Sequence, residues 1–129
     1  MGFINNKVQR RFQDSILGLF FFFGVFNFAN NYGSMAGLTY TDFADGWYVP
    51  SCAELYKIYE NKATIQTSLD AAGGFYIGTY SYWSSSQDAS YYWDACYVYF
   101  YDGYVYSSGK DCDNYVLVLQ AFNYQQFSN

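Results

Sequence analysis

A stretch of eleven residues, 96–106, carries the strongest chemical signal in the chain because five of its residues are tyrosines. Phenol rings offer a large, fairly rigid contact area and a hydroxyl that can donate or accept a hydrogen bond, so adaptable binding surfaces use them heavily. The chemistry they suggest is non-covalent recognition of a ligand. The predicted ligand-binding residues are Tyr97, Tyr99, Tyr101, Tyr104, Tyr106, Asp111, Asp113 and Asn114. The alternative is that these tyrosines pack under neighbouring loops in an aromatic-rich core.

Metal and thiol chemistry have weaker support. The chain has no histidine, which is the commonest general base and a frequent metal ligand. Its three cysteines, Cys52, Cys96 and Cys112, lack the spacing of a zinc site. Cys96 and Cys112 are the pair to consider for a disulfide, but small packing or surface roles are favoured for all three. We therefore expect no metal, no cofactor and no catalytic residue.

The tyrosines require a β-hairpin to position them. Val98 and Phe100 alternate with the first tyrosines, and since successive strand residues point to opposite faces, one face is apolar and the other phenolic. Asp102-Gly103 predicts a two-residue turn of type I′, because glycine tolerates a positive φ. The return strand begins at Tyr104.

The preceding sequence predicts helices. Ser51 and Glu54 form a capping box that starts a helix over about residues 52–61, and Gly33 is a candidate helix C′ residue. A second helix is expected to begin after Thr64 and to end at Gly73-Gly74. Strands are predicted over residues 80–86 and 115–119, the latter buried on both faces. Helices followed by antiparallel strands indicate an α+β domain.

Residues 1–26 differ from the rest. A basic start precedes an apolar run over residues 16–26 that is shorter than the roughly 20 residues of a membrane-spanning helix. This outline fits the basic and apolar regions of a signal peptide or anchor, although the residues that follow do not fit the cleavage region of a signal peptide. The alternatives are a buried segment of the domain and the start of a truncated frame. The domain proper is expected over residues 27–129.

Composition excludes some partners. The chain has 129 residues, a net charge of −5 and an aromatic content of 26%. Such a chain can bury a core as a single domain. Its acidic, tyrosine-rich character argues against nucleic acid as a partner. The expected partner is a protein or a glycan, and a membrane is involved only if the N-terminal segment is an anchor. The oligomeric state stays open.

Several blocks resemble a known family. Residues 45–51, 53–55, 82–87, 97–103 and 116–122 are similar to the DUF1566 group of bacterial domains. These have a C-type-lectin-like fold, related to formylglycine-generating enzymes and to the variable proteins of diversity-generating retroelements. The resemblance implies two helices packed on a small twisted antiparallel sheet with a late β-hairpin, Trp47 and Trp83 in the core, and a ligand surface at the hairpin. It leaves the position of Trp93 open, although this residue would partly substitute for a tryptophan that the family carries just before Tyr97.

The resemblance also implies that diversified members carry Tyr, Ser, Asp, Asn and Cys at exposed positions. Ser107, Ser108 and Cys112 fit this palette beside the predicted binding residues. The chain departs from the family at Cys96, where a tryptophan is usual, and at Leu117 and Gln120, where arginines are usual.

These features favour a non-catalytic ligand-binding domain at the cell surface or secreted, with a diversified surface receptor as one form of it and a cytoplasmic location as the other option. A structural or surface-assembly protein and a degenerate paralogue are the alternatives. The related enzymes use a cysteine pair, but Cys96 and Cys112 have no positioned base here. A calcium-dependent lectin would use Asp111, Asp113 and Asn114 as oxygen ligands, yet a polar turn explains them better, and the proline-containing sugar-binding tripeptide of such lectins is absent.

Overall fold

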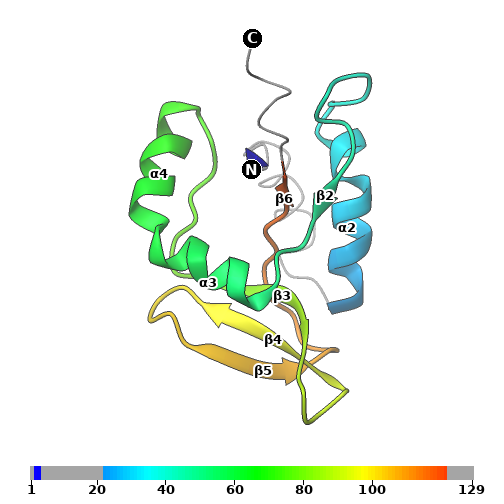
Figure 1. Ribbon diagram of the computed structural model, residues 1–129, viewed down its shortest axis with the longest axis vertical. Helices are drawn as coiled ribbons and strands as arrows, with labels where there is room; N and C mark the ends of the chain where they lie inside the picture. Colours follow the sequence, from blue (N-terminus) through cyan, green and yellow to red (C-terminus); the bar gives the residue numbers. More distant parts are fainter. Residues whose placement is uncertain (1, 4–21, 122–129) are drawn as a thin grey trace.

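A computed structural model describes residues 2–3 and 22–121 (Figure 1). These residues form three helices and two three-stranded antiparallel sheets, which confirms the α+β class. The helices are α2 (Phe22–Met35), α3 (Cys52–Glu60) and α4 (Lys62–Ala71). The strands are β1 (Gly2–Phe3), β2 (Trp47–Tyr48), β3 (Ser81–Gln87), β4 (Asp94–Tyr99), β5 (Val105–Gly109) and β6 (Leu119–Gln120).

Helix α2 begins before the expected domain boundary at residue 27. Phe22 and Val25 are buried in the core, so the folded unit includes residues 22–26. Within the described ranges, no helix has both the length and the apolar character needed to cross a membrane. The signal, anchor and truncated-start alternatives concern a segment of which residues 4–21 lie outside the described residues, and they stay predictions.

The glycine that ends α2 is Gly37, not the expected Gly33. Gly37 has a left-handed φ of 73°. Its amide and that of Leu38 donate to the carbonyls of Ser34 and Gly33 at 3.1 and 2.8 Å, which is the pattern of a Schellman cap. Gly33 lies inside the helix, and glycine is needed there because a larger residue would not fit. A Cβ at this position would be 1.7 Å from the carbonyl oxygen of Ala44. This contact packs α2 against the loop that leads to β2.

Helices α3 and α4 follow each other almost without a break. The Ser51 hydroxyl accepts the Glu54 amide at 3.2 Å, and the Glu54 carboxylate accepts the Ser51 amide at 3.1 Å, which confirms the capping box. Only Asn61 separates α3 from α4, so the second helix starts earlier than the expected position after Thr64. It ends as predicted at Gly73, whose φ is 71°.

The two sheets are linked by the segment that precedes β6. In the first sheet β6 lies between β1 and β2, and the second sheet has the order β3-β4-β5. Residues 116–119 are buried as predicted. The prediction of a strand over residues 115–119 is wrong for most of that range: β6 is Leu119–Gln120, residues 116–118 form no strand, and Tyr115 makes an isolated parallel bridge with Tyr82 of β3. The segment therefore passes from one sheet to the other (Figure 1) and is covered on both sides.

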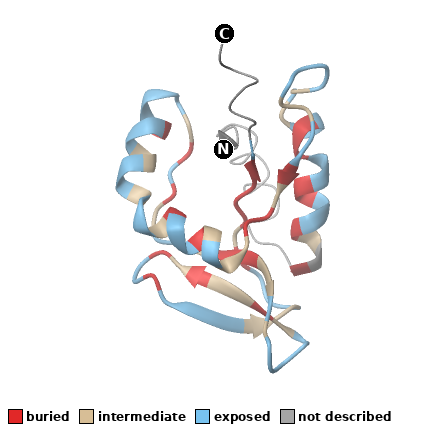
Figure 2. Cartoon of the chain, viewed as in Figure 1, coloured by how far each residue is buried: buried red, intermediate tan, exposed pale blue. Residues whose placement is uncertain are grey.

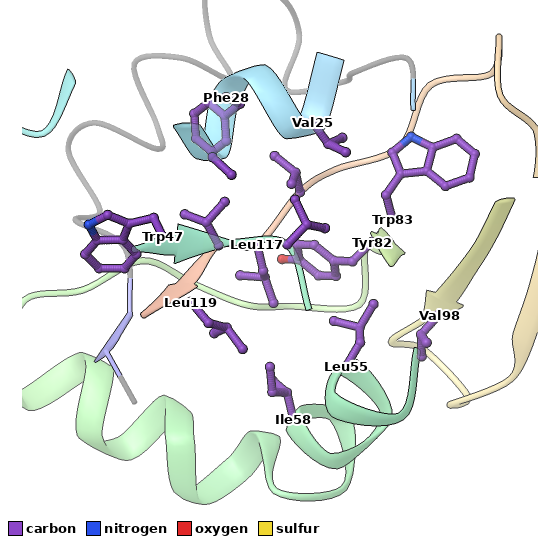
Figure 3. Packing of buried hydrophobic residues seen from close by; sticks show 14 of the residues in the cluster. Val25, Phe28, Trp47, Leu55, Ile58, Tyr82, Trp83, Val98, Leu117 and Leu119 are labelled. Carbon is purple, nitrogen blue, oxygen red and sulfur yellow. The ribbon is translucent and has the colours of Figure 1, made fainter. Parts of the chain in front are cut away.

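One core unites these elements. Its labelled members in Figure 3 are Val25, Phe28, Trp47, Leu55, Ile58, Tyr82, Trp83, Val98, Leu117 and Leu119. Trp47 and Trp83 are buried, so their predicted core role is confirmed. Burial is lowest along β5 and on the outer side of α4 (Figure 2). The hairpin of β4 and β5 thus combines a core-facing strand with an exposed one.

Candidate functional site

The candidate site is the β4–β5 hairpin, which lies at one end of the molecule below α3 (Figure 1). The strands pair with Tyr97 opposite Tyr106 and Val98 opposite Val105. Since side chains alternate along a strand, the two tyrosines share one face and the two valines share the other. Val98 is fully buried, whereas Tyr97 is half-buried and Tyr106 exposed. The predicted division of the hairpin into an apolar and a phenolic face is confirmed, but the apolar face is buried only on β4, since Val105 of β5 is exposed.

The turn is wider than predicted. The Tyr99 amide donates to the Tyr104 carbonyl at 3.0 Å and the Gly103 amide to the Tyr99 carbonyl at 2.7 Å, so residues 100–103 form a four-residue loop. A type I′ turn needs positive φ at both central residues, but only Gly103 has one here, at 80°. The Asp102 carboxylate accepts the Tyr104 amide at 2.9 Å. A two-residue turn would pair Val105 with Phe100, but Val105 pairs with Val98, so the register is displaced by two residues. Because side chains alternate with a period of two, this displacement keeps each strand side chain on the face predicted for it.

Phe100 accounts for the wider loop. Its side chain is fully buried, and its ring packs edge-on against Tyr82 and Tyr59 with centroids 4.9 and 5.7 Å apart. Its amide donates to the Tyr80 carbonyl at 3.0 Å, and its carbonyl accepts the Lys62 ammonium at 2.7 Å. A residue held by α3, α4 and β3 cannot also continue the ladder with β5. The loop is consequently fixed at its base.

The structure brings the five predicted tyrosines together, and we call this surface the tyrosine face: Tyr97, Tyr99, Tyr101, Tyr104 and Tyr106. The rings of Tyr97 and Tyr106 stack at 5.5 Å, and Tyr106 meets Tyr104 at 6.1 Å. Tyr99 and Tyr101 form a second pair at 5.8 Å. Tyr101 and Tyr104 are the most available, with 69% and 65% of their surface exposed.

The inner edge of the tyrosine face is covered. Trp83 of β3 pairs with Tyr97, and their ring centroids are 6.1 Å apart. Trp83 is fully buried and packs against Phe22 of α2 at 5.5 Å. Tyr97 therefore belongs partly to the packing, as the alternative interpretation of these tyrosines proposed. The open part of the face lies over β5 and the hairpin loop.

The polar residues after β5 do not all reach the surface. Asp111 and Asp113 are exposed, but Asn114 is only 9% exposed. Asn114 precedes Tyr115, which the bridge to β3 draws toward the core. Its predicted place on an exposed binding surface is therefore wrong. Ser107 is exposed and Ser108 half-buried.

The negative charge of Asp102 affects the pKa of two tyrosines of the tyrosine face. Burial, then the charges of Cys112 and Asp102, raise the pKa of Tyr97. Loss of solvent, then the charge of Asp102 and those of neighbouring tyrosines, raise the pKa of Tyr106. Asp102 is thus close enough to place a negative field over the stacked ring pair, and at neutral pH the phenols keep their protons.

The geometry offers little for covalent or metal chemistry in the described ranges. No group of three or more cysteine, aspartate and glutamate side chains there is placed to hold a metal ion. All three cysteines are free, so the disulfide considered between Cys96 and Cys112 is not formed. Cys52 packs against the core, and burial and then the charge of Cys96 raise its pKa. Cys112 is exposed.

The sequence did not predict a second exposed aromatic group on the β3–β4 loop. Tyr91, Tyr92 and Trp93 are all largely exposed, which settles the position of Trp93. The Asp88 carboxylate fixes the loop by accepting the Tyr91 amide at 2.9 Å and the Ser107 hydroxyl. Three aromatic residues in a row were the available signal, because consecutive side chains of an extended chain cannot all face one core.

A shallow pocket of about 210 Å³ lies beside α4, lined in part by Lys62, Gln66, Tyr76 and Gly78. Its polar side chains already serve the fold. Lys62 donates to the Phe100 carbonyl at 2.7 Å, and Gln66 donates to Asp70 at 2.9 Å and accepts the Ile77 amide at 2.9 Å.

In comparisons with known proteins, no family model matches the chain, and no curated protein matches it either. The site is therefore interpreted from its geometry.

Proposed function

We propose that this protein is a non-catalytic binding domain that engages a protein or glycan ligand through the tyrosine face. The observation that carries the proposal is the exposure of Tyr101 and Tyr104 on a loop whose base is fixed. Their neighbour Phe100 is fully buried and bonded through both its amide and its carbonyl. A preorganised aromatic surface loses little conformational entropy when it binds, so more of the contact energy becomes affinity.

The arrangement of groups also supports binding. Aromatic area lies at the centre, and Asp102 lies at the rim, where its carboxylate can form adaptable hydrogen bonds. The mixed α+β architecture with its late hairpin is compatible with the C-type-lectin-like fold and with the DUF1566 resemblance, both of which remain part of this proposal. A binding domain of that kind would act at the cell surface or after secretion.

The test is a binding screen of the full chain on arrays of defined glycans and purified proteins. Each ligand found is measured again with Tyr101→Ala, Tyr104→Ala and the control Tyr76→Ala. Tyr76 is 66% exposed, like the two hairpin residues, but lies beside α4. We expect each hairpin variant to weaken binding by about 1–2 kcal/mol, with Tyr76→Ala unchanged. Equal affinities for all three variants would contradict the proposal, and unfolding of the hairpin variants would show that their rings belong to the core.

A second candidate is self-assembly, which one observation favours. Within the described residues, β5 is an outer strand of its sheet, and Val105 and Tyr106 on it are exposed, as is Tyr104 just before it. An outer strand presents unpaired backbone groups that can pair with another chain. Light scattering over a hundredfold range of protein concentration distinguishes the two functions. A mass that rises with concentration and falls back in Val105→Pro supports assembly, whereas a constant monomer mass excludes it.

A further inference from the structure

The acidic groups of the hairpin half have few local counterions. From residue 81 to the end, the sequence contains five aspartates, one lysine and no arginine or glutamate. Three of these aspartates, Asp102, Asp111 and Asp113, are exposed at the hairpin loop or just after β5. The charge of Asp102 reaches both rings of the Tyr97–Tyr106 stack. The Asp102 carboxylate also accepts the Tyr104 amide at 2.9 Å, so among the described residues the tyrosine face carries a negative charge directly beside its exposed rings.

The lysines of the described residues each have an identified contact. Lys110 donates to the Gln87 side chain at 2.7 Å and lies 5.4 Å from the ring centroid of Phe22, on the α2 side. Lys62 donates to the Phe100 carbonyl at 2.7 Å and lies over Tyr59. Lys57 pairs with Glu60 on α3 at 3.5 Å. The contact of Lys62 lies at the base of the hairpin loop, and the rings that Lys62 and Lys110 approach, Tyr59 and Phe22, are not part of the tyrosine face.

This combination has a chemical complement. The negative π face of a phenol ring attracts cations, and a guanidinium plane can stack on such a ring. The same guanidinium can make charge-assisted hydrogen bonds to a carboxylate in a planar geometry, which an ammonium group cannot reproduce. An acidic ligand would meet like charge instead, at a cost in affinity.

We propose that the partner of the tyrosine face is an arginine-rich segment of another protein, with guanidinium groups stacked on the exposed rings and paired with Asp102. This inference rests on the proposed function, and it selects a basic protein over a neutral or acidic glycan.

The probes are three fluorescein-labelled twelve-residue peptides in which glycine alternates with arginine, with lysine, or with citrulline, the neutral analogue of arginine. Fluorescence anisotropy measures their binding to the full chain. We expect the arginine peptide to bind at least about tenfold more tightly than the citrulline peptide and more tightly than the lysine peptide, with affinity falling as salt rises. Equal binding of the arginine and citrulline peptides, or of the arginine and lysine peptides, would overturn the inference.

Two aspartate variants test whether the arginine peptide binds at the hairpin. Asp102→Asn should weaken binding of the arginine peptide about three- to fivefold, whereas Asp42→Asn should leave it unchanged. Asp42 is also exposed and belongs to the loop after α2, and that loop lies at the other end of the molecule from the hairpin (Figure 1). Equal losses in the two variants would indicate a non-specific charge effect and overturn the assignment.

The two proposals fail separately. If Tyr101→Ala abolishes binding of an array ligand while the arginine peptide does not bind, the binding function stands and the partner class is wrong. If Tyr101→Ala changes neither, both proposals are wrong.

Discussion

The loop of the hairpin is held against α3 at Gly103, and Gly103→Ala measures how firmly. Gly103 has a φ of 80°, a conformation that costs a residue with a Cβ about 1–2 kcal/mol. A Cβ there would also lie 2.3 Å from Cε2 of the Tyr59 ring. That ring packs against Phe100 and carries the Lys62 ammonium 5.0 Å from its centroid, so it cannot move freely. Overpacking of this kind costs about 1–3 kcal/mol, giving a total loss of about 2–5 kcal/mol.

Gly73→Ala is the matched control. Gly73 has a nearly equal φ of 71°, but a Cβ there would have nothing within 4 Å. This variant should therefore lose only the conformational part, about 1–2 kcal/mol. Urea unfolding followed by tryptophan fluorescence gives both free energies of unfolding. Equal losses in the two variants would refute the contact between the loop and Tyr59.

A double-mutant cycle isolates the contact itself. In a Tyr59→Ala background the added methyl at Gly103 meets no ring, so Gly103→Ala should cost only its conformational part. The two substitutions should then be non-additive by about 1 kcal/mol or more. Strictly additive losses would show that Tyr59 does not restrain the loop.

Four further predictions concern the frame behind the site. Gly33→Ala should lower the free energy of unfolding by about 2 kcal/mol or more, since its Cβ would meet the backbone of Ala44, and an unchanged thermal midpoint would contradict that packing. Ser51→Ala should cost about 1 kcal/mol in urea unfolding, because the first turn of α3 loses its cap, and a neutral effect would exclude the capping box as a stabilising feature. Burial, then the hydrogen bond to Glu54, raise the pKa of Tyr48 to about 12 from its ordinary 10, so the unfolded state releases the proton first and stability should fall between about pH 10 and 12. Burial raises the pKa of Glu54, but hydrogen bonds from Tyr48 and Ser51 outweigh it and hold the pKa below the ordinary 4.5, so part of the stability should be lost as the pH falls through that pKa. The Tyr48→Phe variant should show a smaller loss at alkaline pH, measured by urea unfolding across the range, and an identical curve would contradict the assignment.

Local signals predicted the local structure well. The capping box of Ser51 and Glu54 needs only residues three positions apart, and the end of α4 at Gly73 follows from the conformational freedom of one residue. The two faces of the hairpin could be predicted for the same reason, because alternation is a property of a single strand.

Features set by distant contacts could not be predicted. The four-residue hairpin loop exists because Phe100 packs between Tyr59 and Tyr82, which lie far from it in sequence. Gly33 needs no Cβ because Ala44 passes over it, not because the helix ends there. Asn114 has the composition of a surface loop, yet its neighbour pairs with β3 and the residue is buried. In each case the sequence shows the residue but not its partner.

The most direct test of the binding function is a nuclear magnetic resonance titration of the full chain with its tyrosine rings labelled with carbon-13. The arginine peptide and the ligands from the arrays serve as probes. The account predicts shift changes concentrated at Tyr101, Tyr104 and Tyr106, with little change at Tyr76 or Tyr91. Shifts centred instead on Tyr76 or Tyr91 would place the binding surface elsewhere and contradict the central claim.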